Sequence, residues 1–206
     1  MQRHVSIALV ALSWIFSVIV FARLPDRMAT HYDLTGNPAR WDPKVIGAYL
    51  LPVLMLLMWA AARWRPRVIA VEGRDDDLEN LRELILTSLL AFLALMHVGI
   101  LGAALNWNVS LPQLLPLGLG ALFLMIGHVL PRLRQSGLIG IRTRFTLRSE
   151  RVWERTHRVA GAIMTAAGSV MIAAGLVDTG RAMPVVIVAA LASALATAGY
   201  AYRARG

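Results

Sequence analysis

Six long apolar stretches alternate with shorter polar segments along the chain. The stretches cover residues 5–22, 46–62, 84–105, 114–130, 159–177 and 184–202. As a helix, the first extends about 27 Å, close to the hydrocarbon thickness of about 30 Å. None shows the alternation of barrel strands, and in lipid only helices and closed barrels satisfy their backbone polar groups. The pattern predicts an all-α integral membrane protein, a six-transmembrane-helix bundle that forms one domain over residues 1–206.

Composition agrees with the membrane class, because 57% of the 206 residues are hydrophobic and the mean hydropathy is +0.60. The first stretch has a second interpretation as a cleaved secretory signal, since basic residues precede it and Val20–Ala22 resembles a cleavage site. It is longer than the usual signal core of about 7–15 residues, and five further stretches follow. We therefore expect a retained first helix.

The distribution of basic residues predicts the orientation. Sixteen of the 21 Lys and Arg lie at the amino end, in segments 63–83 and 131–158, and at the carboxyl end. Cytoplasmic loops are enriched in Lys and Arg, so both termini should be cytoplasmic. We therefore expect a multi-pass membrane protein with both ends of the chain inside the cell. Its net charge of +9 reflects this bias, and we expect no direct nucleic-acid binding.

The outer segment, residues 23–45, contains the polar sequence LPDRMATHYDLTGNPARWDPK. Its three prolines limit freedom and Gly36 with Asn37 suits a tight turn, so an ordered platform is expected. Acidic side chains at Asp26, Asp33 and Asp42 suit a cationic peptide. The alternative is a loop that only caps the bundle. The candidate ligand-binding residues are His31, Tyr32, Asp33, Gly36 and Trp41.

The inner segment, residues 131–158, is rich in arginine. Ser149 can cap a helix that continues into the fifth stretch, and an exposed Trp153 ring would suit docking. Asp77 or Asn80 can similarly cap the third helix. Because only two acids accompany eight arginines, the segment should face anionic headgroups, an acidic partner, or both. The arginines are Arg132, Arg134, Arg142, Arg144, Arg148, Arg151, Arg155 and Arg158.

Two histidines are candidate intramembrane polar residues. His97 lies near the middle of the third stretch and His128 nearer the inner end of the fourth. Such residues usually face the bundle interior, where His97 would line a proton or substrate pathway or form an interhelical hydrogen bond. His31 with two aspartates is too loose a pattern for a metal site. We expect no metal and no cofactor.

Small residues at intervals of four favour close packing of the fifth and sixth helices. The two stripes consist of Thr165, Ser169 and Ala173, and of Ala189, Ser193 and Thr197.

The outer and inner segments together resemble the two signatures of the SdpI-type membrane proteins, which are immunity factors of the sporulation-delaying toxin system and their relatives. The inner signature is the more specific, and Arg144 and Phe145 depart from it where Pro and Trp are expected. Its matching residues are Gly140-Ile141-Arg142-Thr143, Thr146-Leu147, Val152-Trp153 and Thr156-His157-Arg158.

The resemblance implies protection from a secreted antimicrobial peptide, in some members with retention of a transcriptional repressor at the membrane. The expected partners are membrane lipids, a secreted peptide toxin outside and a cytoplasmic repressor. An enzyme is not expected, since no catalytic motif is present. A small transporter with inverted repeats is the alternative. The candidate partner-binding residues are Gly140, Arg142, Thr143, Trp153, Thr156, His157 and Arg158.

Overall fold

Six long helices account for most of the computed structural model, which describes residues 2–33, 37–64, 76–136, 139–177 and 182–203. Each of the six is long and apolar enough to cross a membrane, as the hydrophobic pattern predicts. The helices are α1 (Gln2–Val20), α2 (Lys44–Arg63), α3 (Asp76–Ala104), α4 (Leu111–Val129), α5 (Glu150–Val177) and α6 (Ala182–Arg203).

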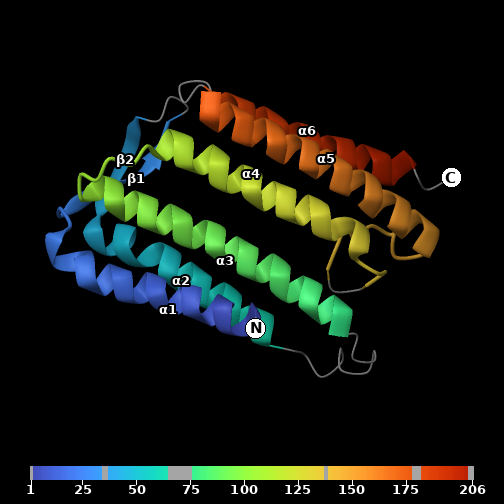
Figure 1. Cartoon of the computed structure of the whole chain (residues 1–206), viewed down its shortest axis with the longest axis horizontal. Helices are drawn as coiled ribbons and strands as arrows, with labels where there is room; N and C mark the ends of the chain where they lie inside the picture. Colours follow the sequence, from blue (N-terminus) through green and yellow to red (C-terminus); the bar gives the residue numbers. More distant parts are fainter. Residues whose placement is uncertain (1, 34–36, 65–75, 137–138, 178–181, 204–206) are drawn as a thin grey trace.

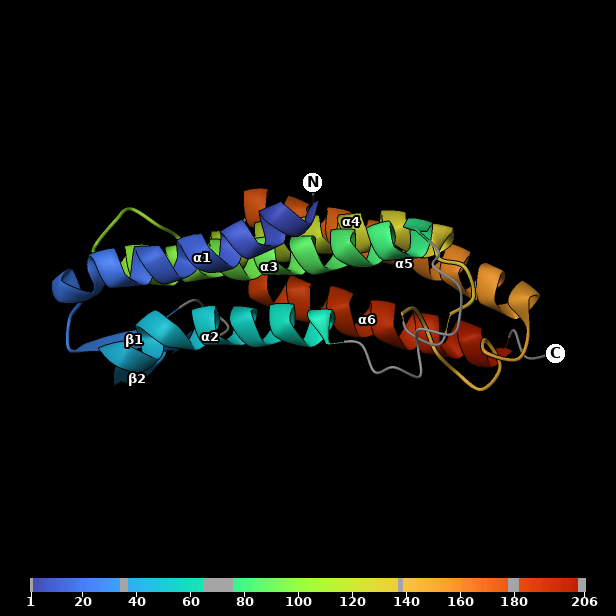
Figure 2. The same cartoon turned by 90° about the horizontal axis from the view of Figure 1, so that it is seen from below.

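The helices run side by side along the long axis of the molecule (Figure 1). A small β-hairpin lies at one end of the bundle, whereas α1 begins and α6 ends toward the other. Seen from below, α2 and α6 lie under a layer formed by α1, α3, α4 and α5 (Figure 2). We call the hairpin end the outer end and the opposite end the inner end.

The hairpin corrects the expectation of a purely α-helical chain. Strands β1 (Arg27–Tyr32) and β2 (Pro38–Pro43) pair in antiparallel fashion, with Met28 opposite Asp42 and Ala29 opposite Trp41. Pairing satisfies the backbone of a segment that lies outside the apolar stretches. Two short 3-10 helices, η1 (Phe21–Arg23) and η3 (Leu130–Arg132), follow α1 and α4.

Two expected helix starts have different outcomes. The Val152 N–H lies 3.4 Å from Ser149 Oγ, and α5 continues without a break into its apolar part. By contrast, α3 already begins at Asp76, so the prediction that Asp77 or Asn80 caps it is wrong. The acidic residues extend the helix toward the inner end beyond the apolar stretch.

The closest helix pair is α4 with α5, whose backbones meet at glycines. A Cβ added to Gly168 would lie 2.6 Å from Gly120 O, and one added to Gly161 would lie 2.6 Å from Gly127 O. In α5, Ser169 is exposed and donates a hydrogen bond back to Thr165 O. The predicted stripe contact of α5 with α6 is therefore wrong at Ser169, because the face of α5 that packs most closely carries the glycines.

A buried ion pair joins α2 to α3 at the inner end. Both Nη atoms of Arg63 contact the carboxylate of Glu83, and Nη2 also lies 3.2 Å from Ser6 Oγ of α1. Glu83 is only 3% exposed. An apolar cluster of Val10, Met55 and Leu90 follows farther along the same three helices.

Candidate functional site

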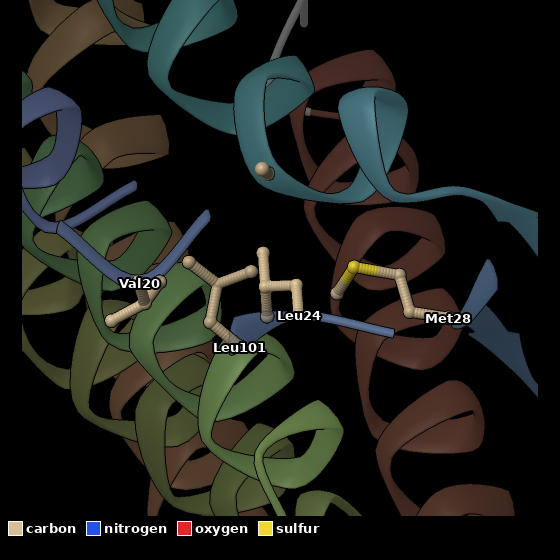
Figure 3. Close-up of a cluster of buried hydrophobic side chains, with 5 residues drawn as sticks. Val20, Leu24, Met28 and Leu101 are labelled. Atoms are coloured by element: carbon tan, nitrogen blue, oxygen red, sulfur yellow. The ribbon is translucent and has the colours of Figure 1, made fainter. Parts of the chain in front are cut away.

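The outer hairpin is anchored to the bundle by apolar side chains. Met28 of β1 is 1% exposed and clusters with Val20, Leu24, Ala48 and Leu101. Figure 3 shows the labelled Val20, Leu24 and Leu101 side chains gathered beneath α2, with the Met28 side chain extending toward them from the strand. The hairpin is therefore held in a fixed position over the outer ends of α1, α2 and α3.

Acidic side chains of the hairpin are occupied by neighbouring groups. Asp42 is buried, accepts a hydrogen bond from Thr30 Oγ1, and lies 3.0 Å from Nε of Arg40. The Thr30 hydrogen bond, followed by the contact with Arg40, lowers the pKa of Asp42, although desolvation opposes the shift. The stabilisation from ionised Asp42 is consequently lost as the pH falls through its lowered pKa. Asp26 lies 3.1 Å from Lys44 Nζ.

A hollow lies between the hairpin and the turn that joins α3 to α4. It consists of two adjoining cavities of about 470 and 490 Å³ that share Pro25, Ala104 and Asn106. We call it the outer groove. Its further lining comprises Val20, Arg23, Arg27, Met28, Ala29, Tyr32, Pro38, Trp41, Ala103, Leu105, Trp107, Val109, Ser110, Leu111 and Pro112.

The turn from α3 to α4 shapes one wall of the outer groove. Asn106 has a positive φ of 60°, a conformation that Asn adopts more readily than most residues. The Trp107 ring packs across Gly102, where a Cβ would lie 2.8 Å from the indole Cε3. The chain then enters α4 at Leu111. A helix and a hairpin that are distant in sequence thus share one concave surface.

Only part of the predicted outer site lies in this groove. Tyr32 and Trp41 line it, and burial raises the pKa of the Tyr32 hydroxyl. His31 and Asp33 are exposed and do not belong to the lining. Gly36 lies outside the described residues. Sequence reasoning missed Arg23, Arg27 and the α3–α4 turn, although the polar and Pro-containing sequence NWNVSLPQ marked that turn.

At the inner end, the arginine-rich segment is folded onto the start of α5. Trp153 Nε1 donates to Leu133 O at 2.7 Å, and the Ile141 N–H donates to His157 Nε2 at 2.9 Å. The Trp153 and His157 rings stack with centroids 4.1 Å apart. Gly140, with a φ of +108°, passes directly over these rings. We call Leu133, Gly140, Ile141, Trp153 and His157 the inner latch.

Hydrogen bonds within the segment extend the latch. Thr146 Oγ1 donates to Ile141 O at 2.7 Å and accepts from the Thr143 N–H at 2.8 Å. Gln135 Nε2 donates to Thr146 O at 2.6 Å. The segment is thereby given a defined shape without a disulfide.

The inner latch corrects the expectation that Trp153 presents an exposed ring. Trp153 and His157 are 0% exposed and Thr156 is 1% exposed. Their helical spacing places them on the inward face, where the indole and imidazole groups bond the loop backbone. The exposed candidates are Gly140, Arg142 and Arg158, with Thr143 partly buried.

We predict that His157→Ala will loosen the arginine-rich segment without removing any of its charge. The substitution deletes the acceptor for the Ile141 N–H and the ring stacked on Trp153. A buried unpaired donor costs about 1–3 kcal/mol. Limited proteolysis between Leu133 and Ser149 should become faster, whereas an unchanged cleavage rate would contradict a locking role. Arg158→Ala, which removes an exposed side chain next to His157, is the matched control.

The two histidines that the sequence marks as intramembrane candidates differ in their surroundings. His97 is 0% exposed, and its Nε2 lies 2.9 Å from Ser17 Oγ, which also lies 2.7 Å from Ala48 O. These contacts join α1, α2 and α3. His128 is exposed near the end of α4, where Arg132 Nη2 lies 2.9 Å from its Nε2.

In the described part of the chain, no three His, Asp or Glu side chains are grouped closely enough to hold a metal ion.

Comparisons with known proteins agree with the sequence resemblance. Residues 132–201 match the SdpI/YfhL protein family, and residues 8–56 match a domain of unknown function, DUF1648. The chain is 26% identical over 164 residues to the immunity protein SdpI of Bacillus subtilis strain 168, covering 79% of this chain and 76% of that protein. No solved structure matches significantly. The resemblance to SdpI-type proteins is confirmed, and with its six membrane-spanning helices the chain is a multi-pass cell-membrane protein.

Proposed function

We propose that this SdpI-like membrane protein protects its cell by binding a secreted antimicrobial peptide in the outer groove. The observation that carries the proposal is the groove itself, which the hairpin and the α3–α4 turn form at one end of the bundle. The similarity to an immunity protein supplies the class of function. A concave surface with aromatic and apolar walls suits a peptide that must be captured near the membrane.

We also propose that binding outside the cell is signalled to a partner at the inner end of the bundle. The exposed arginines of the segment held by the inner latch form a cationic surface that suits an acidic patch on a cytoplasmic repressor or anionic lipid headgroups. Because Trp153 and His157 are buried, their role is to shape this surface. The partner itself would contact residues such as Arg142 and Arg158.

Both functions require the groove outside and the latch inside the cell. The sequence contains no cysteine, so single cysteines can report orientation. We predict that a cysteine at Trp41 will react in intact cells with a maleimide that does not cross membranes, whereas one at Arg151 will react only after permeabilisation. Labelling of Arg151→Cys in intact cells would contradict the orientation.

Protection can be tested by expressing the chain in a sensitive bacterium and challenging the cells with secreted antimicrobial peptides. We predict survival at a peptide concentration about tenfold higher than in cells without the protein, a change of the size that one order of magnitude in affinity would give. Trp41→Ala should reduce this protection, because the Trp41 side chain lines the groove.

The control for the protection experiment is Trp64→Ala, which changes a tryptophan that is 78% exposed at the end of α2, away from the groove. Membrane amounts of all variants should be equal. If Trp41→Ala is present in the membrane in an equal amount and still protects fully, the groove is not required for protection. Absence of protection by the unchanged protein against every peptide tested would contradict the proposed function.

One observation favours the alternative function as a transporter, and another opposes it. Ser17 Oγ of α1 contacts both His97 Nε2 and Ala48 O of α2, so this histidine belongs to a polar cluster shared by three helices. The apolar cluster of Val10, Met55 and Leu90 lies between it and the Arg63–Glu83 pair along those helices. In the described structure, this layer interrupts a polar path, so immunity is the function that we put forward.

A further inference from the structure

We infer that the outer groove selects an apolar peptide segment bearing a carboxylate, rather than a cationic segment. The inference rests on the proposed function and specifies its ligand. It reverses the expectation drawn from Asp26, Asp33 and Asp42 in the sequence, because none of these acids lines the groove.

Acidic groups on the outer face are engaged elsewhere. Asp26 pairs with Lys44, and Asp42 is held by Thr30 and Arg40. Asp33 accepts a hydrogen bond from the Asn37 N–H at 2.8 Å. The Asp26 side chain is 94% exposed and Asp33 is also exposed, but both lie outside the lining, so neither offers a carboxylate to a ligand within the groove.

The charged side chains that line the groove are both arginines. Arg23 lines one cavity and Arg27 the other, and both are exposed. Arg27 Nη2 donates to Trp41 O at 2.9 Å, while neither arginine forms an ion pair with an acid among the described residues. A guanidinium with remaining donors binds a carboxylate in a well-defined geometry. The charge of the lining is therefore complementary to an acidic ligand.

The rest of the lining favours an apolar chain around that carboxylate. Met28, Trp41, Trp107 and Val109 contribute apolar walls, and Trp41 and Trp107 are each about half exposed. Large rings that retain exposed surface can still bury apolar area against a ligand. We therefore assign the groove to an apolar peptide segment with an acidic side chain, not to a lipid headgroup alone.

The test uses the full-length protein in phosphatidylcholine nanodiscs and one short apolar peptide without tryptophan, made in two forms. The forms carry either two aspartates or two lysines at the same positions and have blocked ends. Tryptophan fluorescence reports binding, with empty nanodiscs subtracted. We expect the aspartate form to bind about tenfold more tightly than the lysine form, as a charge-assisted hydrogen bond predicts.

Substitutions test whether the preference for the aspartate form arises in the groove or from the overall positive charge of the protein. Arg27→Gln should reduce the preference for aspartate, Arg27→Lys should retain more of it, and Arg23→Gln together with Arg27→Gln should abolish it. Arg203→Gln removes the same charge from an exposed residue at the other end of the bundle and should leave the preference unchanged. An equal effect of Arg27→Gln and Arg203→Gln would overturn the inference.

Each remaining outcome is also decisive. Equal or tighter binding of the lysine form, or no binding of either form at millimolar concentration, would overturn the inference. So would an Arg27-dependent fluorescence change caused by adding phosphatidylglycerol without peptide, since that result would identify a lipid site. If the aspartate form binds as expected but cells are not protected, the inference stands and the proposed function fails.

Discussion

Gly168→Ala should lower the thermal unfolding midpoint of the detergent-solubilised protein and reduce its amount in the membrane. A Cβ at this position would lie 2.6 Å from Gly120 O and 2.9 Å from Leu124 N. Backbone atoms cannot move aside as a side-chain end can, so α4 and α5 must separate. Overpacking of this kind costs about 1–3 kcal/mol, and we expect the upper part of that range.

Gly199→Ala in α6 is the matched control. A Cβ there meets no atom within 4 Å, and Ala is favoured over Gly in a helix by about 1 kcal/mol. The control should leave the unfolding midpoint unchanged or raise it slightly. If Gly168→Ala behaves like this control, the close approach of α4 and α5 does not exist in the membrane-extracted protein.

Glu83→Ala should be the most destabilising substitution of a charged residue. It leaves the Arg63 guanidinium without its carboxylate partner in a site where Glu83 is 3% exposed. Breaking a buried pair by removing one partner costs about 3–5 kcal/mol. Since the Arg63 side chain retains 26% exposure, we expect the lower end of this range, measured as unfolding in denaturant.

The pair can be tested by a second variant that removes both charges. Arg63→Met with Glu83→Leu should unfold at a higher denaturant concentration than Glu83→Ala alone, because no buried charge is left unpaired. A double variant that is less stable than the single one would show that the packing at these positions matters more than the ion pair.

The sequence was sufficient to predict the six helices, because a continuous apolar run has few other structures open to it in lipid. It did not predict the β-hairpin, since β1 and β2 are short and lack a simple alternation of polar and apolar residues. The bulges beside His31 disturb the pairing and hide the pattern further.

Prediction of the sites failed where a residue's role depends on tertiary packing. The inner signature located Trp153 and His157, but which face of the helix they occupy follows from the loop that folds over them. Likewise, the acids of residues 23–45 are conspicuous in the sequence, whereas their pairing with Lys44 and Arg40 is visible only in the folded hairpin. The arginines that line the groove became recognisable only once the α3–α4 turn was placed beside them.

The glycine contacts between α4 and α5 also determine how the two ends of the molecule can communicate. Leu111 at the start of α4 lines the outer groove, and Val129 at its end packs with Trp153 of the inner latch. Backbone contact at two levels opposes a sliding movement of α4 along α5, because such a shift would bring backbone atoms of the two helices into collision. The two helices should instead move as one unit over the length of α4, which is about 28 Å for its 19 residues. We therefore expect that a ligand that shifts the start of α4 would tilt α4 and α5 together. The arginine surface at the inner end would then move with them.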